Sequence, residues 1–269
     1  MGILSGLQSD PQGTIIYLLY RIPAILIALT LHELAHGYVA LRCGDPTAQM
    51  MGRLSFNPLR HLDPIGTVFM LLFGFGWAKP VPVNPRNFRK FRRDDLLVSI
   101  AGVVMNFCLF LLSMILIVAV NELMWKPELW TLLRSRKYFI SLYEYMYSDA
   151  THDSVPVVEY FSSYLRVPWL AYVLTFLKTF TLLNLGLALF NLLPIPPLDG
   201  YHVVNDIFLR GKLHLSARVV QYISLGLMAF IFIPRFTGLP DYFSLGIGTA
   251  IEFIYENVQK AILAVAGLG

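Results

Sequence analysis

Three polar side chains lie close together in an apolar run at residues 29–44, LTLHELAHGYVALRCG. On a helix, residues four apart share a face, so His32 and His36 can direct two imidazoles at one ion. The carboxylate of Glu33 lies beside them and can activate a water molecule. This HExxH spacing predicts a metal-dependent hydrolase. A purely structural polar cluster is a costly alternative inside a membrane helix.

A third ligand is expected from the motif NLLPIPPLDG at residues 191–200. Pro194, Pro196 and Pro197 cannot continue a helix, and Gly200 permits a tight turn directly after Asp199. We expect Asp199 to complete the ligand set, because two histidines and one carboxylate with an open position form a typical catalytic zinc site. The cofactor we expect is one Zn²⁺ per chain.

The two motifs together resemble the site-2 protease family of intramembrane zinc metalloproteases, in a compact form without a PDZ or regulatory domain. GRLSFNPLRHLDPIGT at 52–67 resembles the family's membrane-dipping segment, and AGVVMN at 101–106 resembles its AGPxxN helix, with Val103 in place of Pro. The similarity covers about residues 25–205. It implies that His32, His36 and Asp199 bind zinc and that Glu33 is the general base.

The resemblance also implies that Asn191 holds the substrate backbone or the developing oxyanion. An interhelical hydrogen bond is the alternative for Asn191, and it is the better interpretation of Asn106. We expect His61 and His202 to be interfacial histidines, although His202 could also orient a metal ligand. Cys43 and Cys108 are expected to be inert, buried thiols.

The composition of the 269-residue chain is that of a membrane protein. Hydrophobic residues make up 56% of the sequence and charged residues only 14%, and the mean hydropathy is +0.61. These values fall outside the range of ordinary globular domains. The net charge of +4 is too small to indicate a nucleic-acid partner. The expected partners are the lipid bilayer and a transmembrane protein or peptide substrate.

Several apolar runs are long enough to cross a bilayer. We expect spans at about 14–42, 96–120, 168–193 and 219–234. The tail at 242–268 carries charges four residues apart, which favours a helix at the interface or against the bundle over a lipid-exposed span. The predicted fold is an all-α polytopic membrane protein with a three-helix catalytic core and about two further membrane helices. We expect one membrane-embedded protease domain over 1–269, with the core at about 14–205 and the C-terminal helices at about 219–268.

Two connecting segments have distinct compositions. Residues 44–93 are interrupted by prolines, and the apolar run at 65–76 is too short to span a bilayer. We therefore expect a non-helical, re-entrant and β-like loop. An unwound substrate segment could pair with the edge of this loop as an added strand. The segment is also rich in Lys and Arg, which places it and the active site on the cytoplasmic side of the cell membrane. Residues 121–166 are expected to form a plain extramembrane loop on the far side, with a lid or partner surface as the alternative.

The predicted function is therefore intramembrane proteolysis of transmembrane segments. One alternative is a membrane pseudo-protease or metal carrier that keeps zinc and binds clients without cutting them. Because a carrier has no evident use for Glu33, the sequence favours the enzyme. Another alternative is a zinc hydrolase that acts on lipids or small peptides.

Overall fold

The computed structural model describes residues 3–73, 76–135, 162–213, 215–237 and 239–267. The described part is helical and contains no β-sheet; two isolated bridges join Leu62 to Ala78 and Trp125 to Leu165. The predicted all-α class is confirmed. The elements are α1 (Ile3–Ser9), α2 (Pro11–Cys43), α3 (Thr47–Met50), η1 (Pro58–Arg60), α4 (Pro64–Phe73), η2 (Pro85–Asn87), α5 (Phe91–Met124), α6 (Pro127–Ser135), η3 (Ser162–Tyr164), α9 (Leu170–Asn191), α10 (Asp199–Ile207), α11 (Ala217–Thr237) and α12 (Tyr242–Val265).

Within the described residues, four helices are long and apolar enough to cross a membrane, namely α2, α5, α9 and residues 217–234 of α11. They coincide with the four predicted spans. Local sequence sets the ends of α2: the Asp10 side chain caps its first turn and Pro11 occupies the first helical position. Gly44 ends the helix in a left-handed conformation with a φ of 110°.

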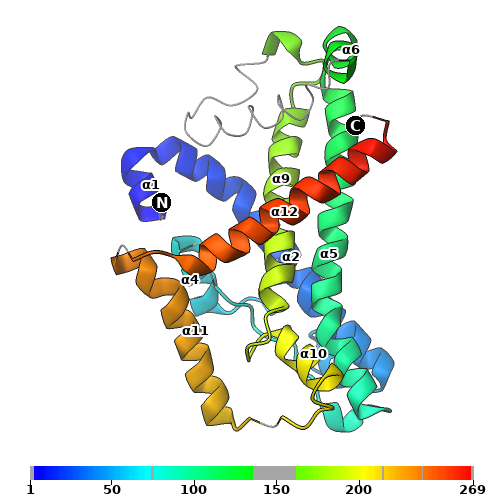
Figure 1. The fold of residues 1–269 in the computed structure, drawn as a ribbon, viewed down its shortest axis with the longest axis vertical. Coiled ribbons are helices and arrows are strands. Elements are labelled where there is room, and N and C mark those ends of the chain that lie inside the picture. The colour runs from blue at the N-terminus through cyan, green and yellow to red at the C-terminus, as the bar shows by residue number, and fades with distance from the viewer. Residues whose placement is uncertain (1–2, 74–75, 136–161, 214, 238, 268–269) are drawn as a thin grey trace.

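Helices α2, α5 and α9 pack against one another (Figure 1). The contact between α2 and α9 contains Ala24, Ala28 and Phe180, all buried. Small side chains at such positions allow the helix backbones to approach closely. The three helices therefore form the framework that positions the polar residues of the first and third spans.

Helix α12 runs obliquely across α9 and α5 (Figure 1). Its apolar face, which includes Ile251, Ile254 and Tyr255, packs on Phe110 and Leu185. The opposite face is exposed and carries its charges, with Lys260 Nζ 3.5 Å from a carboxylate oxygen of Glu256. This arrangement agrees with the prediction of a charged helix that lies against the bundle.

The segment 44–93 differs from the expected non-helical, β-like loop. Pro64–Phe73 is an α-helix, whose length of about 15 Å is half of what a span needs. In the described part, the β-like pairing is limited to the Leu62–Ala78 bridge and a hydrogen bond of 2.9 Å from Lys79 N–H to the His61 carbonyl. The prediction of a wholly non-helical stretch was wrong because prolines can begin a helix at its first position as well as end one. Most of the predicted loop at 121–166 lies outside the described residues.

Candidate metal centre

Helix α2 carries His32, Glu33 and His36 next to α5. His32 is buried, with 5% of its surface exposed. The Nδ1–H of His36 donates a hydrogen bond of 2.7 Å to the carbonyl of Val98 on α5. This contact assigns the proton to Nδ1 and leaves Nε2 of His36 available as a metal ligand.

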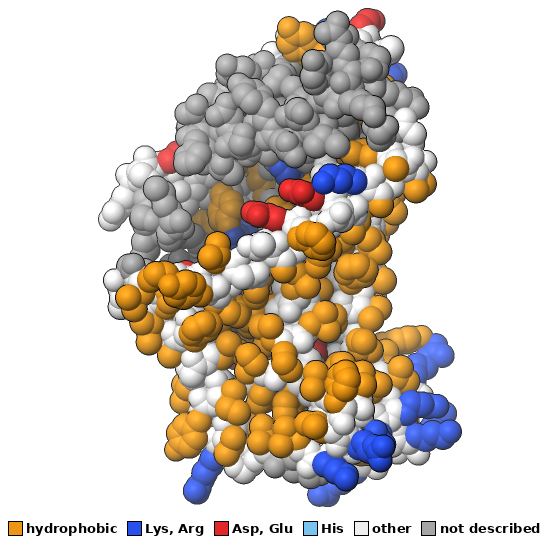
Figure 2. Space-filling view, viewed as in Figure 1, with side chains coloured by type: hydrophobic (Ala, Val, Ile, Leu, Met, Phe, Trp, Pro, Cys, Tyr) orange, Lys and Arg blue, Asp and Glu red, His pale blue; other side chains and the backbone are white. Residues whose placement is uncertain are grey.

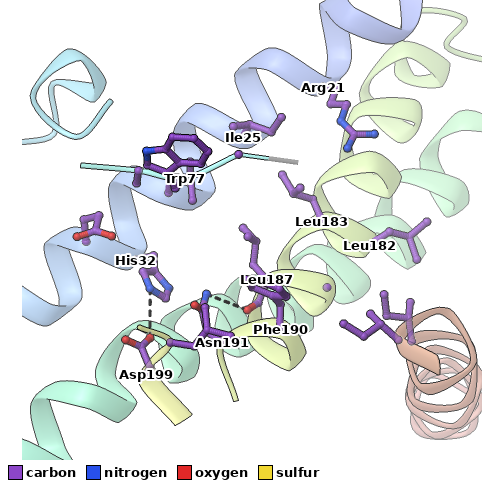
Figure 3. A pocket seen from close by; sticks show the side chains of 18 of the residues that line it. Arg21, Ile25, His32, Trp77, Leu182, Leu183, Leu187, Phe190, Asn191 and Asp199 are labelled. Atoms are coloured by element: carbon purple, nitrogen blue, oxygen red, sulfur yellow. Dashed lines mark hydrogen bonds and ion pairs between the residues drawn. The ribbon is translucent and has the colours of Figure 1, made fainter. Parts of the chain in front are cut away.

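Asp199 begins α10 and meets the two histidines. Its Oδ2 lies 3.4 Å from Nε2 of His32 and 3.3 Å from Nε2 of His36. The two Nε2 atoms are 3.1 Å apart. Figure 3 shows His32 and Asp199 pointing toward each other from α2 and α10.

This triangle of donor atoms fits a zinc ion. Tetrahedral ligands at the usual zinc distances lie roughly 3.3 Å from one another, which is the spacing of these three atoms. Among the described residues, the buried Oδ2 of Asp199 has no hydrogen-bond partner. Burial raises the pKa of Asp199, but contacts with His32 and His36 outweigh it and hold the pKa well below its usual range. The group could supply three ligands of a four-coordinate site.

Gly102 of α5 faces the rings of His32 and His36, and the sequence reasoning missed its role. A Cβ added at Gly102 would lie 2.3 Å from Nε2 of His36 and 2.6 Å from Nε2 of His32. The absence of a side chain at this position leaves the space that an ion and its open coordination position need. The only sequence signal was the presence of Gly102 in the AGVVMN segment.

A second glycine shapes the entry to α10. A Cβ at Gly200 would lie 2.2 Å from the carbonyl oxygen of Leu192. The chain therefore needs glycine here to pack α10 against the end of α9 and to bring Asp199 to the histidines. The predicted tight turn after Asp199 was wrong, because Gly200 is the second residue of helix α10, and glycine is needed there for its lack of a side chain.

Glu33 lies on the side of α2 that faces residues 76–85. The backbone N–H of Val81 donates a hydrogen bond of 2.8 Å to Oε2 of Glu33. A carboxylate held through one oxygen keeps the other available for a second partner. The Val81 contact was not predicted, because it joins residues 48 positions apart.

Asn191 lines the same cavity as the three ligands. Its Nδ2–H donates a hydrogen bond of 3.0 Å to the Leu187 carbonyl one turn back along α9 (Figure 3). This bond lies within one helix, so it is not the interhelical bond considered as the alternative. The role of Asn191 toward a substrate stays a prediction.

The remaining polar candidates are not part of the ligand triangle. His202 is half exposed, and its Nδ1 is 3.3 Å from Oδ2 of Asp95. His61 is fully buried and its Nε2–H donates to the Ser55 carbonyl, while its expected place at the membrane interface stays a prediction. Asn106 is also fully buried, and neither of its side-chain polar atoms has a partner among the described residues, which contradicts the expected interhelical hydrogen bond.

The two cysteines differ in their surroundings. Cys43 is buried at the end of α2, as expected. Cys108 is exposed on α5, so the prediction that it is buried was wrong. An apolar run cannot distinguish the lipid-facing side of a span from its packed side, since both sides are apolar.

The centre opens into one large cavity with a volume of about 1680 Å³. Its walls come from α2, α9, α11, α12 and the segment 76–85. This volume exceeds the range typical of sites for drug-sized ligands. The space is sufficient for a length of polypeptide beside the metal centre.

Comparisons with known proteins are consistent with this geometry. A sequence model of peptidase family M50 matches residues 20–234. The chain is 36% identical over 212 residues to "Putative zinc metalloprotease YwhC" of Bacillus subtilis, a match that covers 79% of this chain and 78% of that protein. "Putative zinc metalloprotease Rip2" of Mycolicibacterium smegmatis is 27% identical over 107 residues, or 38% of this chain and 39% of that protein. No solved structure matches the chain.

Proposed function

Because the chain belongs to peptidase family M50, the site-2 protease family, we propose that it is a zinc metalloendopeptidase that cuts peptide bonds within or near transmembrane segments. The observation that carries the proposal is the convergence of three ligand atoms within 3.4 Å of one another, directly beside Glu33. This convergence occurs on a helix long and apolar enough to cross a membrane.

In this proposal His32, His36 and Asp199 hold the ion. When bound, zinc supplies Lewis-acid chemistry, which polarises a carbonyl and makes a water molecule acidic. Glu33 accepts the proton of the attacking water and transfers it to the departing amine. The Val81 N–H holds one oxygen of Glu33, so the other oxygen is directed at the water. The His36 ring is held by Val98, which keeps its ligand atom toward the ion.

Asn191 is proposed to bind the substrate backbone or the oxyanion. Its amide lies on the cavity wall, and a side-chain amide can donate to the oxygen on which charge develops. To do so, Asn191 exchanges its bond with the Leu187 carbonyl for one with the substrate.

A transmembrane substrate has to unwind locally before it is cut. The backbone amides of a helix are bonded internally, so the scissile carbonyl is shielded until a turn opens. The segment 76–85 on the cavity wall is the part of the described loop that could pair with an unwound backbone. Orientation in the cell membrane, with the centre toward the cytoplasm, is part of the same proposal and rests on the distribution of Lys and Arg.

The experiment that tests this function is mass spectrometry of the products formed from a transmembrane test peptide. The full chain, loaded with zinc in lipid nanodiscs, is expected to cut the peptide within its apolar segment, and Asp199→Ala is expected to leave it intact. A wild-type chain that holds zinc but cuts no peptide would favour the pseudo-protease or carrier. Release of fatty acid without peptide products would favour a lipid hydrolase.

A further inference from the structure

The two histidines of the metal centre differ in how their second ring nitrogen is held. The Nδ1–H of His36 donates to the Val98 carbonyl. Nδ1 of His32 is buried as well, but it has no hydrogen-bond partner among the described residues. Nε2 of His32 belongs to the ligand triangle, so a bound metal leaves the ring proton on Nδ1. Because metal-binding histidines almost always donate this N–H to an acceptor, His32 needs a contact that His36 already has.

A second polar group without a partner, the side chain of Asn106, lies on α5. Asn106 is fully buried, and neither Oδ1 nor Nδ2 has a hydrogen-bond partner in the part of the chain that the structure describes. The residue does not line the large cavity, whereas His32 does. Burial of an unpaired amide is costly, so such a group in a packed helix indicates a specific role or a bound water.

Contacts of α5 on either side of Asn106 place it at the level of His32. One turn earlier, a Cβ added at Gly102 would lie 2.5 Å from Cε1 and 2.6 Å from Nε2 of His32. Three residues later, Leu109 packs against the cluster that contains Ala28, which is one turn before His32 on α2. Gly102, Asn106 and Leu109 share one face of the helix, so Asn106 faces α2 between these two contacts.

The distance between the two unpaired groups suits one bridging water. Cβ positions four residues apart on a helix are about 5–6 Å from each other, which places Cβ of Asn106 within about 8.5 Å of Cε1 of His32. Helical side chains tilt toward the N-terminus, so the Asn106 amide extends over the turn of Gly102, where no side chain fills the space. An amide and one water with two hydrogen bonds of about 2.8 Å cover this span.

From these positions we propose that Asn106 is a positioning residue for the metal ligand His32 and acts through one buried water. The water accepts a hydrogen bond from the Nδ1–H of His32 and donates one to Oδ1 of Asn106. Helix α5 then orients both histidines, His36 through the Val98 carbonyl and His32 through Asn106. The inference rests on the zinc site of the proposed function and adds a residue that fixes its geometry.

This water is distinct from the water that attacks the substrate. Figure 2 shows a broad hydrophobic surface between the charged side chains of α12 and the Lys and Arg side chains gathered at the end of the molecule near α10. Asn106 is enclosed on the lipid side by this apolar packing and is absent from the cavity wall. A water beside it serves the polar groups of the protein, as buried waters with two or more polar partners do.

The test compares zinc affinity with fold stability. We expect Asn106→Leu, which is similar in size and has no polar side-chain atom, to lower zinc affinity about 10- to 100-fold. Competition with a fluorescent chelator measures the affinity of the full chain in detergent, and thermal unfolding shows that the variant is folded. Removal of an amide that serves no ligand would leave zinc affinity unchanged and could stabilise the fold. Wild-type affinity in Asn106→Leu would therefore overturn the proposal.

A conservative variant provides the rescue. Asn106→Asp keeps the size of the side chain and an acceptor oxygen, so its zinc affinity should stay within roughly threefold of wild type. A loss as large as that of Asn106→Leu would contradict the acceptor role.

The control variant is Asn121→Leu, which lies on the same helix and is also buried. Its Nδ2–H donates a hydrogen bond of 2.8 Å to the Ile117 carbonyl. Loss of this bond should lower the unfolding temperature and leave zinc affinity unchanged. A fall in affinity equal to that of Asn106→Leu would show that any damage to α5 disturbs the site, and would refute a specific role of Asn106.

Co²⁺ in place of zinc adds a spectroscopic readout of ligand geometry. The visible absorption bands of the Co²⁺-loaded chain should change in Asn106→Leu and stay as in wild type in Asn121→Leu. Unchanged bands in Asn106→Leu would mean that His32 keeps its orientation without Asn106, against the proposal.

The positioning role and the protease function fail separately, because zinc affinity is measured without substrate. A wild-type chain that binds zinc but cuts no peptide would refute the function and leave the role of Asn106 standing. A chain that cuts peptides, and whose Asn106→Leu variant binds zinc as wild type does, would leave the function standing and refute the role of Asn106.

Discussion

The α-carbon of Gly102 on α5 lies so close to His36 on α2 that an added Cβ would be 2.3 Å from Nε2 of that histidine. The two helices are therefore in contact at the point where the ligand atoms converge. A methyl group there would displace both imidazoles, since it would also lie 2.6 Å from Nε2 of His32.

We predict that Gly102→Ala lowers zinc affinity by about 10- to 100-fold, the range seen when the surroundings of metal ligands are disturbed. Zinc titration against a fluorescent chelator measures the change. Gly226→Ala is the matched control, because a Cβ at that helical position meets nothing within 4 Å. Equal zinc affinity in both variants would show that Gly102 does not shape the site.

Zinc should also stabilise the fold, because its ligands join α2 to α10. At free zinc about 100-fold above the dissociation constant, the free energy of unfolding should rise by about 2.7 kcal/mol. The measurement is thermal unfolding in detergent, with chelator and then with zinc restored. Asp199→Asn should lose most of this increase, and Mg²⁺ should not replace zinc. A Tm that chelation leaves unchanged would argue against a metal at this site.

The hydrogen bond from the Val81 N–H to Glu33 can be removed without changing the Glu33 side chain or any of the three proposed zinc ligands. Val81→Pro lacks the donor, so we expect kcat to fall at least about tenfold while zinc content stays constant. Val81→Ala keeps the N–H and removes only side-chain packing, and it should lose less activity. A proline variant with the kcat of the alanine variant would show that this bond does not orient Glu33.

Asp45 provides a prediction of pH dependence outside the spans. It is fully buried, and although burial raises its pKa, hydrogen bonds from Asn84, Thr47 and Asn87 hold the pKa below the ordinary value of 3.8. A depressed pKa stabilises the fold at neutral pH, and this stabilisation is lost as the pH falls below 3.8 through the folded-state pKa.

Asp45→Asn should therefore destabilise the protein by about 2 kcal/mol near neutral pH. The difference in unfolding free energy between wild type and variant should shrink once the pH falls below 3.8. Denaturant unfolding at several pH values measures it. A constant difference across that range would mean that the ionised form of Asp45 is not what stabilises residues 84–87.

Whether the sequence predicts a contact in the site depends on how far apart the two contacting residues are along the chain. His32, Glu33 and His36 follow from local helix geometry, so their shared placement was predictable. Asp199 was predictable from its Pro and Gly neighbours. Gly102 and Val81 were not, because their contributions depend on where α5 and the segment 76–85 lie relative to α2.

The same distinction applies to the fold. The four apolar spans followed from length and hydropathy. Helix α4 was predicted as non-helical because the surrounding prolines dominate the pattern, although Pro64 occupies the first position of that helix. Exposure of Cys108 depends on which face of α5 packs, and no periodic pattern of polarity marks that face in a membrane helix.

The most direct test of the central claim is the rate at which wild type and Glu33→Gln cut one transmembrane peptide at equal zinc occupancy. Our account predicts equal zinc binding, since His32, His36 and Asp199 are unchanged, and a fall in rate of at least about 100-fold, since the general base is lost. A Glu33→Gln chain that cuts at the wild-type rate would contradict the assignment of Glu33 and the mechanism built on it.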